Sequence, residues 1–326
     1  MRGCQVWPSY NRRVVVAEDL KGRDFTKVAD WEADELLRVL DLADELKRAQ
    51  KAGEEHRLLP GRTLGMIFQK PSTRTRVSFE VGMWQLGGLA LYLSASDLQL
   101  GRGETVKDTA QVLSRYLDAI MIRTFEQADV EELARNSSIP VINGLTDSTH
   151  PCQALADVMT IRERLGRMEG VKVAYFGDGN NVCASLMVAA AKLGMHFVAA
   201  VPPGYEPEDR ALEIARRAAE ETGAAITVVH DPLEAAAEAE VLYTDVWTSM
   251  GQEEERERRL RDLEGFGIRD ELLDAAEDDA IVLHCLPAHY GEEITEEILY
   301  SPRSAVWDEA ENRLHSQKAL LALVVR

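Results

Sequence analysis

The chain has 326 residues, of which 45% are hydrophobic and 29% charged, and its formal net charge is -19. A nucleic acid or an anionic membrane surface would repel such a chain, and no apolar stretch reaches the roughly 20 residues that span a bilayer. The length allows two domains of ordinary size, and the N-terminus lacks the basic and apolar regions of a signal peptide, so we expect a cytoplasmic protein.

The predicted elements alternate between helices and buried strands. Residues 1–18 show no periodicity and are predicted to form a peripheral extension, and a helix is expected over residues 33–50. Apolar runs predict strands at 64–68, 89–93, 119–122, 141–143, 171–176, 196–201, 225–229, 241–244 and 281–284. Helical patterns separate most of them, which is typical of parallel sheets.

This order predicts an α/β protein with two doubly wound, Rossmann-like domains. We place the boundary near residue 150, which gives domains 1–150 and 151–326. A helix over residues 151–166 would link them, and the C-terminal helix at 314–325 is a candidate for packing back on the first domain. Ligands are expected in the cleft between the domains.

A run of phosphate-compatible side chains follows the first predicted strand: Ser72, Thr73, Arg74, Thr75 and Arg76. Ser72 or Thr73 can cap the helix that begins there, which leaves free amides facing a ligand. The two arginines add forked positive charge that matches phosphate oxygens. Taken alone, such a run more often marks a capped helix that carries two solvated arginines, and only further matching segments favour a phosphate site.

Further polar segments occupy equivalent positions later in the chain. Arg123 follows a predicted strand, His150 and Gln153 open a helix, and HCLP at 284–287 follows the last strand. The ligands of parallel α/β sheets gather at strand ends and helix starts. The segments together therefore predict one site for a phosphorylated small molecule.

A dinucleotide site is not expected. Gly177 and Gly179 follow a strand, but Val182 stands where the third glycine of the fingerprint belongs. The next strand ends at Val201 and Pro202 instead of the acidic residue that would hold a ribose hydroxyl.

Seven motifs together resemble the aspartate and ornithine carbamoyltransferase family over about residues 19–326. They are FQKPSTRTRVSFE (68–80), IRT (122–124), HPCQ (150–153), GDGNN (177–181), DVWTSMG (245–251), HCLPAH (284–289) and ENRLHSQKA (311–319). The motifs FQKPSTRTRVSFE and HPCQ resemble those of the family as a whole. The SMG loop together with HCLP resembles the motifs of its ornithine branch. Tyr290 stands where some relatives carry arginine, a place outside the expected chemistry.

The resemblance implies transfer of the carbamoyl group of carbamoyl phosphate to the δ-amine of L-ornithine, giving L-citrulline and phosphate in arginine metabolism. Carbamoyl phosphate would be bound mainly by the first domain, with some residues from the second: Ser72, Thr73, Arg74, Thr75, Gln99, Arg123, His150, Gln153, Cys285, Leu286 and Arg313. The second domain would bind ornithine through Asn181, Asp245, Ser249 and Met250.

The catalytic residues implied by the resemblance are Arg123, His150, Cys285 and Asp245. Arg123 and His150 would donate to the carbonyl oxygen as it becomes an oxyanion, and Asp245 would pair with the α-ammonium of ornithine. Gln153 and the Leu286 carbonyl would hold the carbamoyl nitrogen. Gln99 would reach a phosphate from a neighbouring subunit, which implies a homotrimer.

Cysteine chemistry offers other interpretations of the same residues. Cys285 beside His284 could act as a covalent nucleophile or, with His289, as a zinc ligand. The attacking amine is itself a nucleophile and the arginines neutralise the leaving group, so we expect no metal and no cofactor. The cysteines at 4, 152, 183 and 285 form no CxxC pair, which favours reduced thiols.

Two alternative functions stay open. The first is a carbamoyltransferase for another amine such as putrescine, which lacks the α-groups that Asp245 would hold. The second is a non-catalytic protein that binds a phosphate ligand on the same fold. A mere binder has no need of oxyanion donors, so Arg123 and His150 argue against it.

Overall fold

The computed structural model describes residues 18–99, 103–249 and 251–326. The first half of the chain forms α1 (Ala33–Lys51), β1 (Thr63–Phe68), α2 (Thr73–Gln85), β2 (Leu89–Ser94), α3 (Val106–Leu113), β3 (Ala119–Arg123), α4 (Gln127–Asn136) and β4 (Val141–Leu145). The second half forms α5 (Pro151–Leu165), β5 (Lys172–Phe176), α6 (Asn181–Lys192), β6 (His196–Ala200), α7 (Asp209–Thr222), β7 (Ile226–Val229), α8 (Pro232–Ala236), β8 (Val241–Thr244), α9 (Arg256–Asp262), α10 (Asp270–Ala275), β9 (Ile281–His284), α11 (Glu296–Leu299) and α12 (Val306–Val324).

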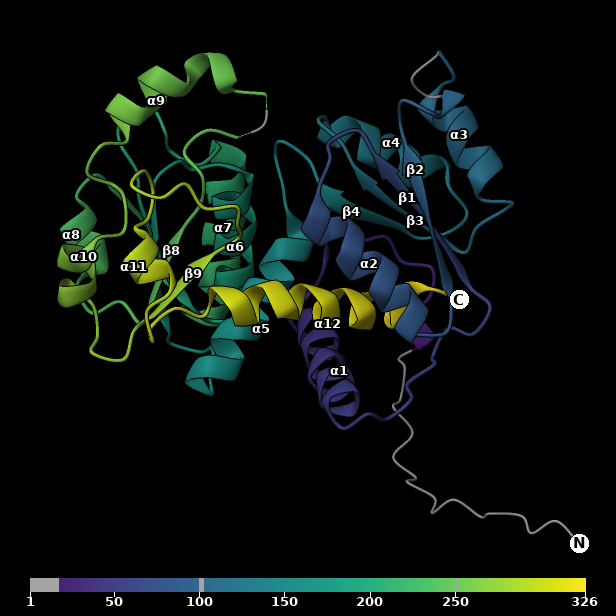
Figure 1. The fold of residues 1–326 in the computed structure, drawn as a ribbon, viewed down its shortest axis with the longest axis horizontal. Helices are drawn as coiled ribbons and strands as arrows, with labels where there is room; N and C mark the ends of the chain where they lie inside the picture. The colour runs from purple at the N-terminus through teal and green to yellow at the C-terminus, as the bar shows by residue number, and fades with distance from the viewer. Residues whose placement is uncertain (1–17, 100–102, 250) are drawn as a thin grey trace, which may run out of the picture.

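The strands form two parallel sheets that lie in separate lobes (Figure 1). The first sheet has the order β2-β1-β3-β4 and the second the order β7-β6-β5-β8-β9. Both are doubly wound, because the direction of strand addition reverses between β1 and β3 and again between β5 and β8. This confirms the predicted fold class, and it places a ligand-binding crevice at the carboxyl ends of these four strands.

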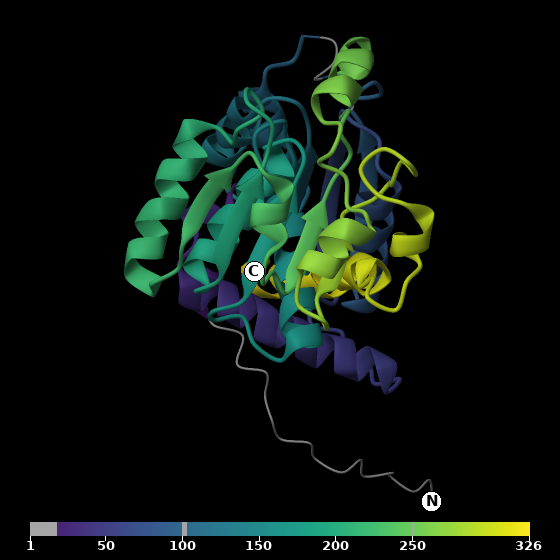
Figure 2. The same cartoon turned by 90° about the vertical axis from the view of Figure 1, so that its left-hand side faces the viewer.

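Helices α1, α5 and α12 join the two lobes. Helix α12 starts beside β9 of the second sheet and packs against α5, α1 and α2 (Figure 1). In Figure 2 the purple α1 lies along the lower edge of the molecule, with the yellow α12 just above it. The Gly22 amide donates to the Val324 carbonyl at 2.7 Å, so the chain end is tied to the first lobe. The boundary near residue 150 stays a prediction.

Helix α12 begins at Val306 rather than at the predicted residue 314. Its first half carries polar residues that are almost completely buried, including Glu309, Asn312 and Arg313. A helix that buries polar and apolar residues alike has no apolar stripe, and the helical period is therefore absent from the sequence. Among the described residues, no helix is long and apolar enough to cross a membrane.

Candidate active site

A cavity of about 650 Å³ lies between the carboxyl ends of the two sheets. Its walls come from the segments that follow β1, β3 and β4 in the first sheet and β5, β8 and β9 in the second, together with α12. The predicted site residues that line it are Ser72, Thr73, Arg74, Thr75, Arg123, His150, Asn181, Asp245, Ser249, Cys285, Leu286 and Arg313. The cavity thus brings together predicted site residues that are up to 241 positions apart in the sequence.

Two of the predicted site residues that the structure describes do not line this cavity. Gln99 is exposed and follows β2 at the edge of the first sheet. Gln153 is 2% exposed and lies behind Arg313, whose Nη1 donates to its Oε1 at 2.6 Å. Met250 lies outside the described residues.

Among the lining residues that were not predicted as site residues, four are ionisable: Lys70, Asp147, Arg256 and His289. Lys70 is buried, pairs with Asp147 and sits 4.3 Å from the centre of the Phe125 ring. Lys70 follows the predicted strand at 64–68 and directly precedes Pro71. This position could have identified it as a cavity residue, because the ends of parallel strands face the crevice.

The segment after β1 forms the predicted anion cradle. Ser72 is the N-cap of α2, and its hydroxyl accepts a hydrogen bond from the Thr75 amide at 3.2 Å. The other amides of this first turn have no partner within the helix, and the helix dipole adds positive potential at the same place. Ser72 thereby orients the start of α2 as an anion-binding helix end.

Arg74 bridges the two lobes by donating to the Leu286 carbonyl. Leu286 has a φ of 58°, a left-handed conformation that costs a residue with a Cβ about 1–2 kcal/mol. Its amide donates to Nδ1 of His284 at 2.8 Å, which holds it in this conformation. Backbone held in such a conformation by its surroundings is typical of ligand-binding segments.

Positive charge gathers in the cavity without carboxylate partners. Arg74, Arg123 and Arg313 form no ion pair with any of the described residues. Burial, and secondly the charge of Arg313, lowers the pKa of Arg123 to about 10. A cluster of guanidinium groups without carboxylate partners destabilises the folded state unless an anion binds there. The cavity is therefore suited to an anionic ligand.

His150 lies beside this cluster and is 5% exposed. Burial and the neighbouring arginines hold its pKa well below the usual value, so the imidazole stays neutral at physiological pH. Its Nδ1 has no hydrogen-bond partner in the described structure, and neither does Nε of Arg123. Unpaired buried groups of this kind are expected where a ligand completes the hydrogen bonding.

Asp245 and Cys285 also line the cavity. The Cys285 thiol donates to Oδ1 of Asp245 at 2.8 Å, and Nδ2 of Asn180 donates to Oδ2 at 2.9 Å. Burial and the Asp245 carboxylate raise the pKa of Cys285 well above its usual value. The residue is therefore a neutral thiol, which makes it a poor covalent nucleophile.

His284 cannot readily serve as a metal ligand beside Cys285. Its Nδ1 accepts from the Leu286 amide, and its Nε2 lies 3.1 Å from Oε1 of the fully buried Glu293. Both ring nitrogens are thus engaged. Because Nδ1 accepts a hydrogen bond from the Leu286 amide, the ring proton lies on Nε2, which donates a hydrogen bond to Glu293.

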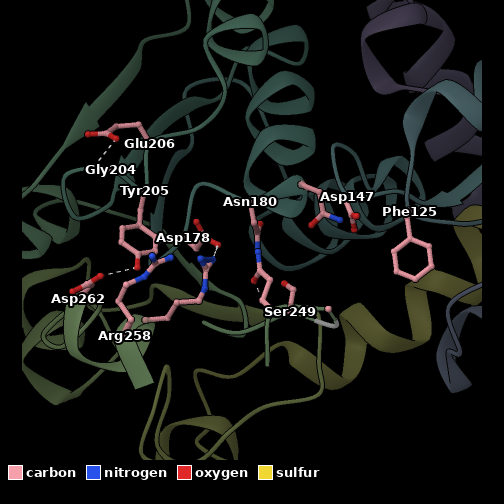
Figure 3. Close-up of a pocket in the computed structure, with 14 residues that line it drawn as sticks. Phe125, Asp147, Asp178, Asn180, Gly204, Tyr205, Glu206, Ser249, Arg258 and Asp262 are labelled. Carbon is pink, nitrogen blue, oxygen red and sulfur yellow. Dashed lines mark hydrogen bonds and ion pairs between the residues drawn. The ribbon is translucent and has the colours of Figure 1, made fainter. Parts of the chain in front are cut away.

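A second cavity of about 730 Å³ adjoins the first and shares Asp147, Asn181 and Ser249 with it. Figure 3 shows its polar lining, with Tyr205, Asp178, Arg258 and Asp262 on one side and Asp147 and Phe125 on the other. The Tyr205 hydroxyl donates to Asp262 at 2.9 Å. The buried Arg259 pairs with Asp178 and donates to the Trp247 carbonyl at 2.7 Å. These contacts tie the segment after β8 to the loops after β5 and β6.

The glycines after β5 serve this packing and need no dinucleotide to explain them. Gly177 has a φ of 121°, and a Cβ on Gly179 would lie 2.3 Å from the Pro207 nitrogen. The loop is therefore pressed against the segment after β6. It ends in Asn181, whose Nδ2 donates across the lobes to the Thr146 carbonyl at 2.6 Å.

Comparisons with known proteins find relatives along almost the whole chain. The family described as aspartate/ornithine carbamoyltransferase matches residues 23–163 with its carbamoyl-P binding domain and residues 169–324 with its Asp/Orn binding domain. The ornithine carbamoyltransferase of Pyrococcus horikoshii is 57% identical over 306 residues, which cover 94% of this chain and 96% of that protein. That of Anoxybacillus flavithermus is 58% identical over 302 residues, covering 93% and 96%.

Solved structures agree with these matches. Ornithine carbamoyltransferase from Pyrococcus furiosus has a TM-score of 0.92 at 56% identity, covering 94% of this chain and 98% of that one. Anabolic ornithine carbamoyltransferase from Campylobacter jejuni has a TM-score of 0.86 at 42% identity, covering 92% and 97%. Motifs, fold and relatives coincide over the same residues, and the chain belongs to the aspartate/ornithine carbamoyltransferase family.

Proposed function

We propose that the chain transfers the carbamoyl group of carbamoyl phosphate to the δ-amine of L-ornithine, giving L-citrulline and phosphate. The observation that carries this proposal is the set of charged side chains in the cavity that have no partner of opposite charge. Arg74, Arg123 and Arg313 form no ion pair with any of the described residues, and neither does Asp245, whose carboxylate accepts from the Cys285 thiol. A dianionic donor suits the arginines, and the ammonium group of an amino acid suits Asp245.

The phosphoryl group is assigned to the cradle after β1. The α2 amides, the hydroxyls of Ser72, Thr73 and Thr75, and the Arg74 guanidinium supply donors to its oxygens. The same donors stabilise the negative charge that accumulates on phosphate as it leaves. No covalent intermediate is needed, because the amine attacks the carbonyl carbon directly.

Arg123 and His150 are assigned to the carbonyl oxygen. When the amine attacks, this oxygen becomes negative, and buried donors already aimed at it stabilise the charge without reorganisation. The neutral imidazole donates one N–H, while Arg123 adds a full positive charge. Gln153, proposed to hold the carbamoyl nitrogen, reaches the cavity through Arg313 in this structure.

Asp245, Asn181 and Ser249 are assigned to the amino acid. The Asp245 carboxylate attracts the α-ammonium, and Asn181 offers an amide to the carboxylate. Cys285 adjoins Asp245 and is proposed to contact the chain near the δ-amine. Met250 keeps its predicted role in the loop that closes over ornithine.

The pH dependence of the reaction should follow the substrate amine. An alkylamine of this kind has a pKa of about 10.4, so its reactive neutral form increases about tenfold per pH unit below that value. His150, with its lowered pKa, and Cys285, with its raised pKa, both stay neutral between about pH 6 and 8.5. We therefore expect kcat/KM for ornithine to climb across this range in initial-rate assays. A flat profile would contradict it.

The direct test offers ornithine, putrescine, aspartate and N-acetylornithine in parallel to the purified protein with carbamoyl phosphate. Selective formation of citrulline from ornithine supports the proposal. Preference for another acceptor would keep the carbamoyl phosphate assignments and overturn those of Asn181, Asp245 and Ser249. No turnover with any acceptor would favour the non-catalytic alternative.

A homotrimer is proposed from the surface of the first lobe. Large apolar side chains are exposed on α2, β2 and α3, namely Val77, Trp84, Leu89, Leu91, Tyr92 and Val112, and β2 is the edge strand of its sheet. Exposed apolar surface beside an open sheet edge is typical of an interface. Gln99 follows this strand and is exposed toward solvent.

Light scattering should give three times the chain mass of 36.3 kDa, or a multiple of that. A monomer with full activity would contradict both the trimer and the role of Gln99. The cytoplasmic location stays a prediction.

A further inference from the structure

Two buried carboxyl groups, Asp157 on α5 and Glu309 on α12, lie behind the cavity. They are 0% and 1% exposed, and Nε2 of Gln153 lies within hydrogen-bond distance of both, at 2.8 and 2.9 Å. Neither forms an ion pair with a cation among the described residues. Two adjacent buried carboxylates would repel each other and lack solvation, so the pair is stable only if it holds a proton between its oxygens.

The surrounding donors indicate which group carries this proton. Glu309 accepts from Nε2 of Gln153 at 2.9 Å, from the Tyr243 hydroxyl at 3.2 Å and from the His284 amide at 2.9 Å. Asp157 accepts only from Gln153, at 2.8 Å, and its Oδ2 has no donor. Three donors favour the carboxylate at Glu309, so the proton belongs on Oδ2 of Asp157 and is donated to Glu309.

The pair is connected to the cavity by two routes. The Gln153 amide group, held by both carboxyls, accepts from Arg313, which also donates to the Thr75 hydroxyl at 3.2 Å and lines the cavity. The second route is the His284 amide, which fixes the start of the segment that carries Cys285. Residues of α2, α5, β9 and α12 therefore depend on one acid pair.

We propose that Asp157 and Glu309 are positioning residues that share one proton and thereby hold Gln153 and Arg313 in the orientation that receives the carbamoyl group. This inference rests on the proposed function. Neither residue lines the cavity, so both act through Gln153. The Gln153 amide contacts Asp157, Glu309 and Arg313, and it keeps these three contacts only while the acid pair carries a single negative charge.

The pH dependence follows from the charges around the pair. The ionisable groups that face it are Arg313 on α12, Tyr243 on β8 and Cys285 after β9. Burial raises the pKa values of Tyr243 and Cys285 well above their usual values, so both stay neutral and Arg313 is the cation. Burial also raises the pKa of Asp157 to about 7 and that of Glu309 well above its usual value. The pair therefore loses the first of its two protons near pH 7 and keeps the second well above it, so the single negative charge that holds Gln153 is present only above about pH 7.

The test compares KM for carbamoyl phosphate at pH 6.5 and pH 9, with ornithine saturating. In the wild-type enzyme we expect KM to be about fourfold higher at pH 6.5, where most of the pairs are neutral, than at pH 9. In Asp157→Asn the amide oxygen still accepts from Gln153 and the amide N–H still donates to Glu309, so the ratio should fall below about twofold. The control is Asp308→Asn, the adjacent and partly exposed residue that pairs with Arg164; it should keep the wild-type ratio.

Glu309→Gln should behave differently from Asp157→Asn. Three donors converge on Glu309, and a glutamine offers only one acceptor oxygen, so one donor would face its amide N–H. We expect KM for carbamoyl phosphate to rise about tenfold at both pH values. Equal effects of the two substitutions, with similar thermal midpoints, would indicate simple packing and overturn the proposal, as would a wild-type ratio near one.

An infrared measurement separates this proposal from the reaction itself. A protonated carboxyl band should appear in the wild-type protein at pH 6.5 and be missing from Asp157→Asn. Absence of that band from the wild type would overturn the shared proton even if citrulline forms. A wild-type protein that shows the band but forms no citrulline would instead overturn the proposed reaction and, with it, the positioning role.

Discussion

Replacing Arg123 with alanine should lower kcat for citrulline formation by about 10²–10³-fold, the usual effect of removing one buried donor to an oxyanion. Arg123 is 6% exposed, has no carboxylate partner and presents an unpaired Nε. Its charge is therefore available to a ligand in the cavity and takes part in no ion pair among the described residues that would stabilise the fold. Because the oxyanion exists only in the transition state, kcat should fall more than KM for ornithine rises.

The matched control is Arg135→Ala, which removes an exposed arginine from the last turn of α4 in the same lobe. It should change kcat by less than about twofold, as is usual for surface residues. Steady-state assays with both substrates saturating give the comparison. Equal kcat values for Arg123→Ala and the wild type would exclude Arg123 from the oxyanion role.

Asp245→Asn should lower kcat/KM for ornithine by about 10²-fold, because the α-ammonium would lose a buried charged partner worth roughly 2–5 kcal/mol. The carboxylate is held by the Cys285 thiol and by Nδ2 of Asn180, so it is fixed before the substrate arrives. Putrescine has no α-ammonium, and the preference for ornithine over putrescine should fall by a similar factor.

The control for this change is Asp278→Asn, which neutralises an exposed aspartate in the turn before β9. It should leave both kcat/KM values within about twofold of the wild type. A loss of activity toward ornithine and putrescine by equal factors would place Asp245 on the chemical step and not on the α-group.

The fold was largely predictable, because parallel sheets have strong local signals. Strands such as β3 and β8 are continuous apolar runs bounded by turns, and the helices between them show ordinary caps. The order of strands within each sheet depends on long-range contacts and was not predicted. The short helices α10 and α11 were missed since four to six residues carry too little periodicity.

The site was predictable where side chains stand at strand ends. Arg123 closes β3, and Ser72 precedes α2, so topology alone directs both into the crevice. The Asp157–Glu309 pair was missed because each acid lies in a helix whose other residues gave no sign of the contact. A buried acid within a run of small and apolar residues, as at Asp157, was the one available signal.

Helix α12 also decides the order in which the chain can fold on the ribosome. Its last turns, from Leu320 to Val324, are buried, and the helix packs against α1 and α2, which precede it in the chain by more than 200 residues. Domains normally fold in turn as they emerge, the N-terminal one first. Here the first lobe keeps an uncovered apolar face until α12 has left the exit tunnel and can pack against it.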